Sequence, residues 1–128
     1  MRILKQALPV LLLAVLMAGC TSTAITNLTP HQQFRNASGL YPVEAALSST
    51  QQSMRWDSIK PSVVIGNDFY PMRQTQLMKN RWETLVPVPA GKSIVYYRFK
   101  FDYDYNAFGP AKPDSKLSPE LRLQIVDK

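Results

Sequence analysis

The 128-residue sequence is poor in the residues that most often carry metal or covalent chemistry. One cysteine excludes an intramolecular disulfide, and one histidine, His31, excludes a histidine-rich metal cluster. The five glycines form no phosphate-binding loop. No pair of acidic residues stands out as an acid–base couple, and no serine has a recognisable base or nucleophile elbow beside it. We therefore expect a protein that is not an enzyme and that needs no metal or other cofactor.

The N-terminus has the pattern of a signal peptide. Arg2 and Lys5 form a short positive region, and an almost wholly apolar run of twelve residues follows from Ala7 to Ala18. A membrane-spanning helix needs about 20 apolar residues, so this run is too short for a span and has the length of a signal-peptide core. Residues 1–19 are therefore predicted to be a signal peptide.

The apolar run ends in Met17-Ala18-Gly19-Cys20, which resembles the lipobox of bacterial lipoproteins. The resemblance implies cleavage after Gly19 and lipidation of Cys20. Acyl chains such as palmitate contribute about 0.8 kcal/mol per buried methylene, so two or three of them anchor a protein firmly to a membrane. The aspartate that marks inner-membrane retention in enteric bacteria is absent after Cys20, so we expect an outer-membrane lipoprotein of the cell envelope, on its periplasmic or surface side. The alternative is an ordinary secretory signal followed by an unrelated cysteine.

The charge balance is mildly basic. Arg2 and Lys5 leave with the signal peptide, so the 15 basic residues become 13 against 9 acidic residues, a net charge of +4. That charge favours solubility over association with anionic envelope surfaces. No stretch interleaves aromatic with basic residues as a nucleic-acid surface does, so we expect no nucleic-acid partner.

Residues 20–39 are predicted to be a lipid-anchored tether. The stretch TSTAITNLTPHQQFRNASG is rich in serine, threonine, asparagine and glutamine and has no sustained periodicity. Such a composition is typical of a flexible connection. His31 lies in this stretch without a predicted partner.

From residue 40 onwards the pattern is that of strands. Apolar residues alternate with others at Tyr41, Val43, Ala45 and Leu47. A helix from Val43 to Met54 is the alternative, which Ser48-Ser49-Thr50 in its middle disfavours. Further strands are predicted at residues 62–65, 81–88, 95–105 and 121–126, with a turn at residues 66–68 and a loop at residues 107–119. Short strands separated by proline and glycine turns predict an all-β fold, a small β-sandwich over residues 40–128.

One succession within these strands is more specific. It runs VVIGNDFYPM, then RWETLVPVPAG, then YYRFKFDY, over about residues 62–104. This succession resembles the early-set (E-set) immunoglobulin-like domains, particularly the starch- and glycogen-binding modules. The resemblance implies an immunoglobulin-like sandwich with Trp82 in its core. The ligand-binding modules carry a sugar-stacking tryptophan shortly after the Asp-Phe turn, and this chain has none there. Trp56 and Tyr70 are therefore the candidate ligand-stacking residues, with the core as the alternative place for each.

The triplet Asp102, Asp104 and Asn106 has the spacing of calcium-loop ligands. An EF-hand loop also needs glycine at its sixth position and glutamate at its twelfth, and here these are Ala107 and Pro113. The triplet is instead predicted to continue the polar face of a strand whose other face is aromatic.

Two functional classes fit these observations. The first is a structural or adaptor lipoprotein that binds another envelope protein, for example through an exposed strand edge. The alternative is a glycan-binding module that holds polysaccharide near the membrane. An exposed Tyr70 beside Trp56 on a flat sheet face would favour the alternative.

Overall fold

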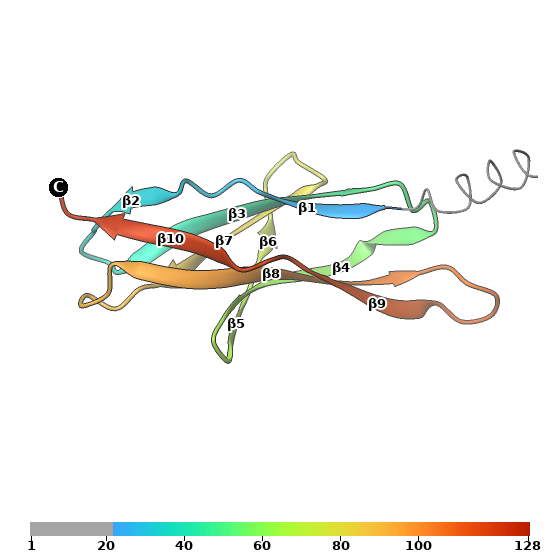
Figure 1. Cartoon of the computed structure of the whole chain (residues 1–128). Coiled ribbons are helices and arrows are strands. Elements are labelled where there is room, and N and C mark those ends of the chain that lie inside the picture. Colours follow the sequence, from blue (N-terminus) through green and yellow to red (C-terminus); the bar gives the residue numbers. More distant parts are fainter. Residues whose placement is uncertain (1–21) are drawn as a thin grey trace, which may run out of the picture.

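The computed structural model describes residues 22–128, so Cys20 and the predicted signal peptide lie outside the described residues. Within that range the chain forms ten strands and no helix, arranged as two layered sheets (Figure 1). The strands are β1 (Thr23–Asn27), β2 (Gln32–Phe34), β3 (Leu40–Ser49), β4 (Met54–Ile65), β5 (Asp68–Pro71), β6 (Arg73–Gln74), β7 (Arg81–Pro87), β8 (Ile94–Tyr105), β9 (Lys112–Leu117) and β10 (Leu121–Val126). The prediction of an all-β, sandwich-like fold is confirmed.

The two sheets have a defined strand order. The four-stranded sheet has the order β1-β3-β7-β6, and the six-stranded sheet has the order β2-β10-β8-β4-β5, with β9 also paired to β8. The short β2 runs parallel to β10, whereas the other pairs are antiparallel. That the sandwich is immunoglobulin-like, and that it belongs to the early-set branch, both stay predictions.

The core lies between the sheets and follows the predicted alternation. On β3 the buried side chains are those of Tyr41, Val43, Ala45 and Leu47, so the helical alternative is wrong. On β8 the side chains of Val95, Tyr97, Phe99, Phe101 and Tyr103 are buried. Trp82 of β7 packs edge-on against Phe101, with ring centroids 5.4 Å apart. Aromatic pairs in this arrangement add to the stabilisation that comes from burial alone.

The prediction of a flexible tether is wrong over the described residues 22–39. β1 pairs with β3 in one sheet, and β2 pairs with β10 in the other. Between them Thr29 is buried, and its hydroxyl group bonds both the backbone nitrogen and the backbone oxygen of Glu44. Because hydrogen bonds from polar side chains to backbone groups hold this segment in place, its sequence shows little hydrophobic periodicity. The sandwich therefore begins at residue 23, not at residue 40.

The predicted loop at residues 107–119 contains a strand. β9 pairs with the second half of β8, and β10 pairs with the first half, so the two strands follow one another along the same edge of β8. All six side chains of β9 are exposed. A strand without a buried face shows no apolar alternation, and for that reason the sequence pattern did not predict it.

Candidate functional site

Trp56 lies in an irregular segment of β4. The pairing of β4 with β8 shifts register between Arg55 and Lys60, so residues 56–59 do not follow the regular alternation of faces. The Trp56 side chain is 42% exposed. It borders an open hollow of about 560 Å³, whose lining residues are Trp56, Asp57, Gln74, Lys79 and Asn80. An exposed indole surrounded by amide, carboxylate and ammonium groups offers one stacking surface and several hydrogen-bonding groups.

Tyr70 lies elsewhere on the six-stranded sheet. It is half-buried, packs against the hydrophobic core and pairs with Val63 in the register of β5 and β4. The hollow that it borders also includes Leu40, Val88, Ile94 and Tyr96 but not Trp56. The two candidate stacking residues therefore line separate hollows and share no platform.

The Asp102, Asp104 and Asn106 triplet continues the polar face at the end of β8, as predicted. The carboxylate of Asp102 accepts a hydrogen bond from Lys100 at 3.4 Å, and the side-chain oxygen of Asn106 accepts one from Arg55 Nε at 2.7 Å. Over residues 22–128, no group of three or more histidine, cysteine, aspartate or glutamate residues is placed to hold a metal ion.

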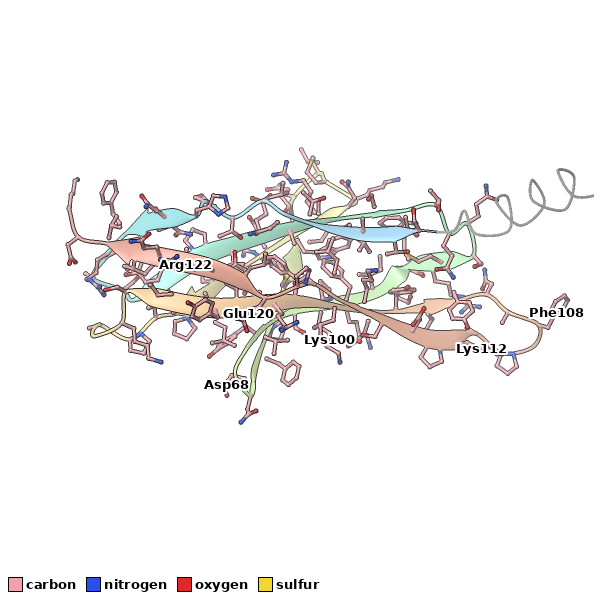
Figure 2. The ribbon with its side chains drawn as sticks, viewed as in Figure 1. Asp68, Lys100, Phe108, Lys112, Glu120 and Arg122 are labelled. Atoms are coloured by element: carbon pink, nitrogen blue, oxygen red, sulfur yellow. The ribbon has the colours of Figure 1, made fainter. Side chains whose placement is uncertain are left out.

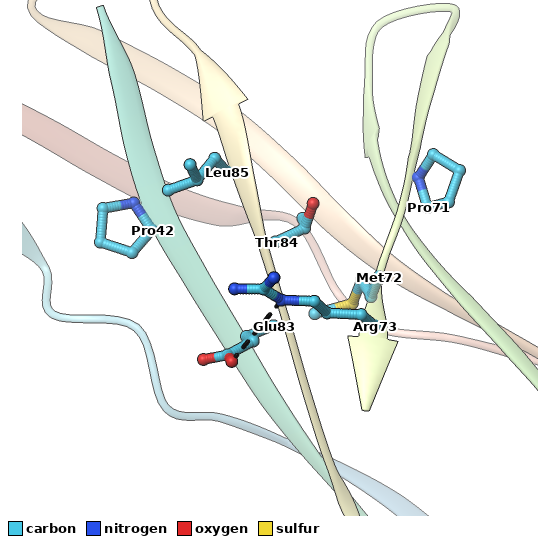
Figure 3. Close-up of a pocket in the computed structure, with 7 residues that line it drawn as sticks. All are labelled: Pro42, Pro71, Met72, Arg73, Glu83, Thr84 and Leu85. Carbon is cyan, nitrogen blue, oxygen red and sulfur yellow. Dashed lines mark ion pairs between the residues drawn. The ribbon is translucent and has the colours of Figure 1, made fainter. Parts of the chain in front are cut away.

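A further hollow of about 560 Å³ lies where the chain crosses from β5 to β6 (Figure 3). Its lining residues are Pro42, Pro71, Met72, Arg73, Glu83, Thr84 and Leu85. Arg73 Nε and Glu83 Oε1 are 3.8 Å apart, and the Arg73 side chain is largely exposed whereas that of Glu83 is partly buried. An exposed ion pair of this kind contributes little free energy. The hollow is mainly apolar and provides a packing surface, not a reactive centre.

Sequence reasoning missed a group of exposed apolar side chains on the outer face of the six-stranded sheet. Phe69, Tyr96 and Leu117 are 58%, 54% and 52% exposed, respectively. They come from β5, β8 and β9, strands that the sequence alone did not place side by side. We call these three side chains and their neighbours on the same face the outer patch, which consists of Val64, Phe69, Tyr96, Arg98, Lys100, Leu117 and Arg122.

Strand register brings the outer patch together. Phe69 lies opposite Val64, and Val64 lies opposite Arg98. Leu117 lies opposite Lys100 on the other side of β8. Tyr96 in turn lies opposite Arg122 of β10. Because the odd-numbered residues of β8 from 95 to 103 are buried, the even-numbered ones between them face outwards.

The charges of the outer patch are mostly positive. Arg98, Lys100 and Arg122 contribute three cations, and Figure 2 shows Lys100, Glu120 and Arg122 along the same stretch of the sheet. The carboxylates of Asp102 and Glu120 approach Lys100 and Arg98 to 3.4 and 4.0 Å. Lys100 Nζ also lies 5.7 Å from the centre of the Phe69 ring, within cation–π range.

Tyr103 links β8 to β9 on the opposite, inward face. Its hydroxyl group donates a hydrogen bond to Asp114 Oδ2 at 3.2 Å. Burial raises the pKa of Tyr103, and the negative charge of Asp114 raises this pKa further. A hydrogen bond with the Thr23 side chain opposes part of the rise in this pKa. The phenol therefore stays protonated well beyond neutral pH and keeps its bond to β9.

No helix within residues 22–128 has the length and hydropathy needed to cross a membrane. Comparisons with protein-family models, with curated proteins and with solved structures found no match to this chain. The candidate sites therefore rest on the geometry described above.

Proposed function

We propose that this protein is a non-enzymatic lipoprotein, held on the outer membrane of a bacterial cell envelope by lipid on Cys20, with a structural or adaptor role. Its outer patch binds another envelope protein. The observation that carries the proposal is the clustering of Phe69, Tyr96 and Leu117 with arginine and lysine on one open sheet face. Aromatic residues and arginine are enriched where proteins contact one another, and a few of them supply most of the binding energy.

Charge defines the kind of partner. The three cations of the outer patch outnumber the two carboxylates, Asp102 and Glu120, that lie close to them. The mature chain also has a net charge of +4, because 13 basic residues remain against 9 acidic ones. A complementary partner presents apolar side chains flanked by aspartate or glutamate.

The test is photo-crosslinking in intact cells with a photoreactive amino acid in place of Tyr96. The matched control carries the same group in place of Leu85, which is also 54% exposed but lies on β7 in the other sheet. We expect one stoichiometric protein partner to be captured from position 96 and not from position 85. Identical products from both positions would contradict the outer patch as the binding surface.

Second-site variants test whether that capture depends on the outer patch. Phe69→Ala and Arg98→Glu, each added to the position-96 protein, should abolish capture, because they remove an aromatic contact and reverse a charge. Thermal unfolding should be nearly unchanged for Phe69→Ala, whose side chain is 58% exposed, and should stay cooperative for Arg98→Glu, whose side chain is 42% exposed. Persistent capture by both variants would show that the crosslink does not report the proposed contact.

The lipid anchor is tested separately. Mass spectrometry of the purified protein should find an N-terminal Cys20 that carries diacylglycerol. Cys20→Ala should move the protein out of the membrane fraction. An unmodified thiol at Cys20 would contradict the anchor but would leave the outer patch open to the crosslinking test.

The second candidate function is binding of polysaccharide, favoured by one observation, the exposed Trp56 beside Asp57, Gln74 and Asn80. Retention on peptidoglycan sacculi and on insoluble starch tests it. Trp56→Ala should abolish retention, whereas Tyr70→Ala, in a separate hollow, should not. No retention of the unaltered protein on either polysaccharide would exclude this function for both glycans.

A further inference from the structure

The first described residue lies at the end of the sandwich where the β8–β9 turn also lies. The backbone nitrogen of Ser22 donates to Thr50 Oγ1 at 2.7 Å, and the backbone nitrogen of Thr50 donates to the Ser22 oxygen at 2.8 Å. In the same turn between β3 and β4, the Ser53 oxygen accepts a hydrogen bond from the backbone nitrogen of Asn106 at 2.8 Å. Residue 22 and both turns therefore form one continuous end, which we call the anchor end.

The β8–β9 turn carries an exposed aromatic side chain at its tip. Phe108 is fully exposed, and Figure 2 shows it at the outermost point of the turn, directed away from both sheets. The turn, residues 106–111 with the sequence NAFGPA, contains no charged residue. Gly109 has a φ of 91°, which glycine adopts without strain, and the ring of Pro110 fixes the φ of Pro110 itself. We call residues 106–111 the hairpin tip.

The chain leaves little room between a lipid on Cys20 and the anchor end. Only Thr21 separates Cys20 from Ser22. Consecutive Cα atoms are about 3.8 Å apart, so the Cα atoms of Cys20 and Ser22 are at most about 8 Å apart. Because residues 23–27 already form β1, no long tether intervenes. A lipid on Cys20 would therefore hold the anchor end at the membrane surface.

We propose that the hairpin tip inserts Phe108 into the interfacial region of the lipid bilayer, as a second membrane contact beside the lipid. The proposal rests on the lipidation of Cys20 proposed above. Aromatic side chains are favourable at the headgroup level of a bilayer, where a bare aromatic tip on a rigid turn buries its apolar surface. Two contacts at one end fix the orientation, so β8 points away from the membrane and the outer patch faces sideways.

The charges around the hairpin tip indicate which membranes it fits. Arg55 and Lys112 lie beside it, but Asp104 faces Arg55 in the strand register, and Arg55 itself bonds Asn106. Two cations against one carboxylate leave a surplus of one positive charge, which is too small for a polybasic lipid-binding cluster, so we expect insertion into zwitterionic bilayers without a requirement for anionic lipid.

The test uses the lipidated mature protein in phosphatidylcholine vesicles, with Phe108→Cys labelled by an environment-sensitive dye. A lipidated Cys20 has no free thiol, so one dye per chain is expected. The matched control is Phe34→Cys, which is 61% exposed and lies in β2, beside the C-terminal strand. We expect blue-shifted emission at position 108, quenched by lipid-borne nitroxide, and water-like emission at position 34.

Each outcome of the labelling experiment decides the proposal. One dye per chain with water-like emission at position 108 would overturn the hairpin tip as a membrane contact and leave the anchor intact. Two dyes per chain would reveal a free Cys20 and overturn the anchor together with the membrane contact that rests on it. A blue shift in intact cells but not in vesicles would assign the hairpin tip to a protein partner instead.

A second variant avoids the dye. Phe108→Ser in the lipidated protein should transfer between vesicles on the order of tenfold faster, the factor expected from losing partial burial of one phenylalanine side chain. Phe34→Ser should transfer at the rate of the unaltered protein. Equal transfer rates for Phe108→Ser and the unaltered protein would contradict the insertion of Phe108.

Discussion

The backbone nitrogen of Phe99 donates its hydrogen bond to the side-chain oxygen of Ser118, at 2.8 Å, and the backbone nitrogen of Ser118 donates to the Phe99 oxygen at 2.9 Å. A hydroxyl group thus stands in for a backbone carbonyl at the point where β9 ends and β10 begins. Ser118 is buried, so the Phe99 nitrogen has no ready access to a replacement water. This one side chain allows two strands to follow each other along β8 without an unpaired backbone group.

Ser118→Ala should lower the free energy of unfolding by about 1–3 kcal/mol, because it leaves the Phe99 nitrogen buried without an acceptor. Urea denaturation measures the loss. Ser115→Ala, on the exposed strand β9, is the matched control and should change stability by about 0.5 kcal/mol or less. Equal losses in the two variants would show that the Ser118 hydroxyl group has no special role.

The two tryptophans should respond differently to the same substitution. Trp82→Ala removes a buried ring that packs against Phe101, and should cost about 3–5 kcal/mol. Trp56→Ala removes a side chain that is 42% exposed, and should cost about 1 kcal/mol or less. Thermal or urea unfolding of both variants checks this, and a large loss for Trp56→Ala would place that indole in the core.

The raised pKa of Tyr103 predicts a pH dependence in the alkaline range. The folded state holds the phenolic proton more tightly than the unfolded chain, in which the pKa of tyrosine is about 10. The resulting stabilisation is complete below about pH 10 and is lost as pH rises through the folded-state pKa. The stability difference between the unaltered protein and Tyr103→Phe should therefore be constant from pH 7 to 9 and shrink above pH 10. Urea denaturation midpoints of both proteins, measured from pH 7 to above pH 10, test this prediction. A stability difference that grew above pH 10 would contradict it.

Limited trypsin digestion should separate a docked N-terminal segment from a tether. The Arg35 side chain bonds Asp127 at 2.8 Å and the backbone oxygens of Ala90 and Lys92 at 2.9 and 3.2 Å. Lys79 lies in an exposed turn. We expect cleavage after Lys79 before cleavage after Arg35, whereas a flexible tether would be cut first at Arg35.

The strands that the sequence predicted are those with one buried face. β3 and β8 alternate apolar residues with others because their inner faces fill the core. By contrast, β1, β2 and β9 are held mainly by backbone pairing at sheet edges, and β9 has no buried side chain. Their sequences resemble loops, so periodicity did not predict them.

The candidate sites were predictable to a smaller extent. Residue type alone nominated Trp56, and the structure leaves it 42% exposed. Nothing local shows that Tyr70 packs against the core, since that depends on which strands lie opposite. The outer patch needs Phe69 and Leu117 on either side of β8, a neighbour relationship that comes from sheet order and register and not from any one segment.

The pairing of β2 with β10 joins the beginning and the end of the described chain, because Gln32 lies beside Gln124, 92 residues later. A chain still being synthesised has no partner for β2 until β10 emerges. Closing so long a loop is slow, so we expect the sandwich to close only after β10 has been synthesised. Ribosome-bound or C-terminally truncated chains should then remain open substrates for chaperones and proteases.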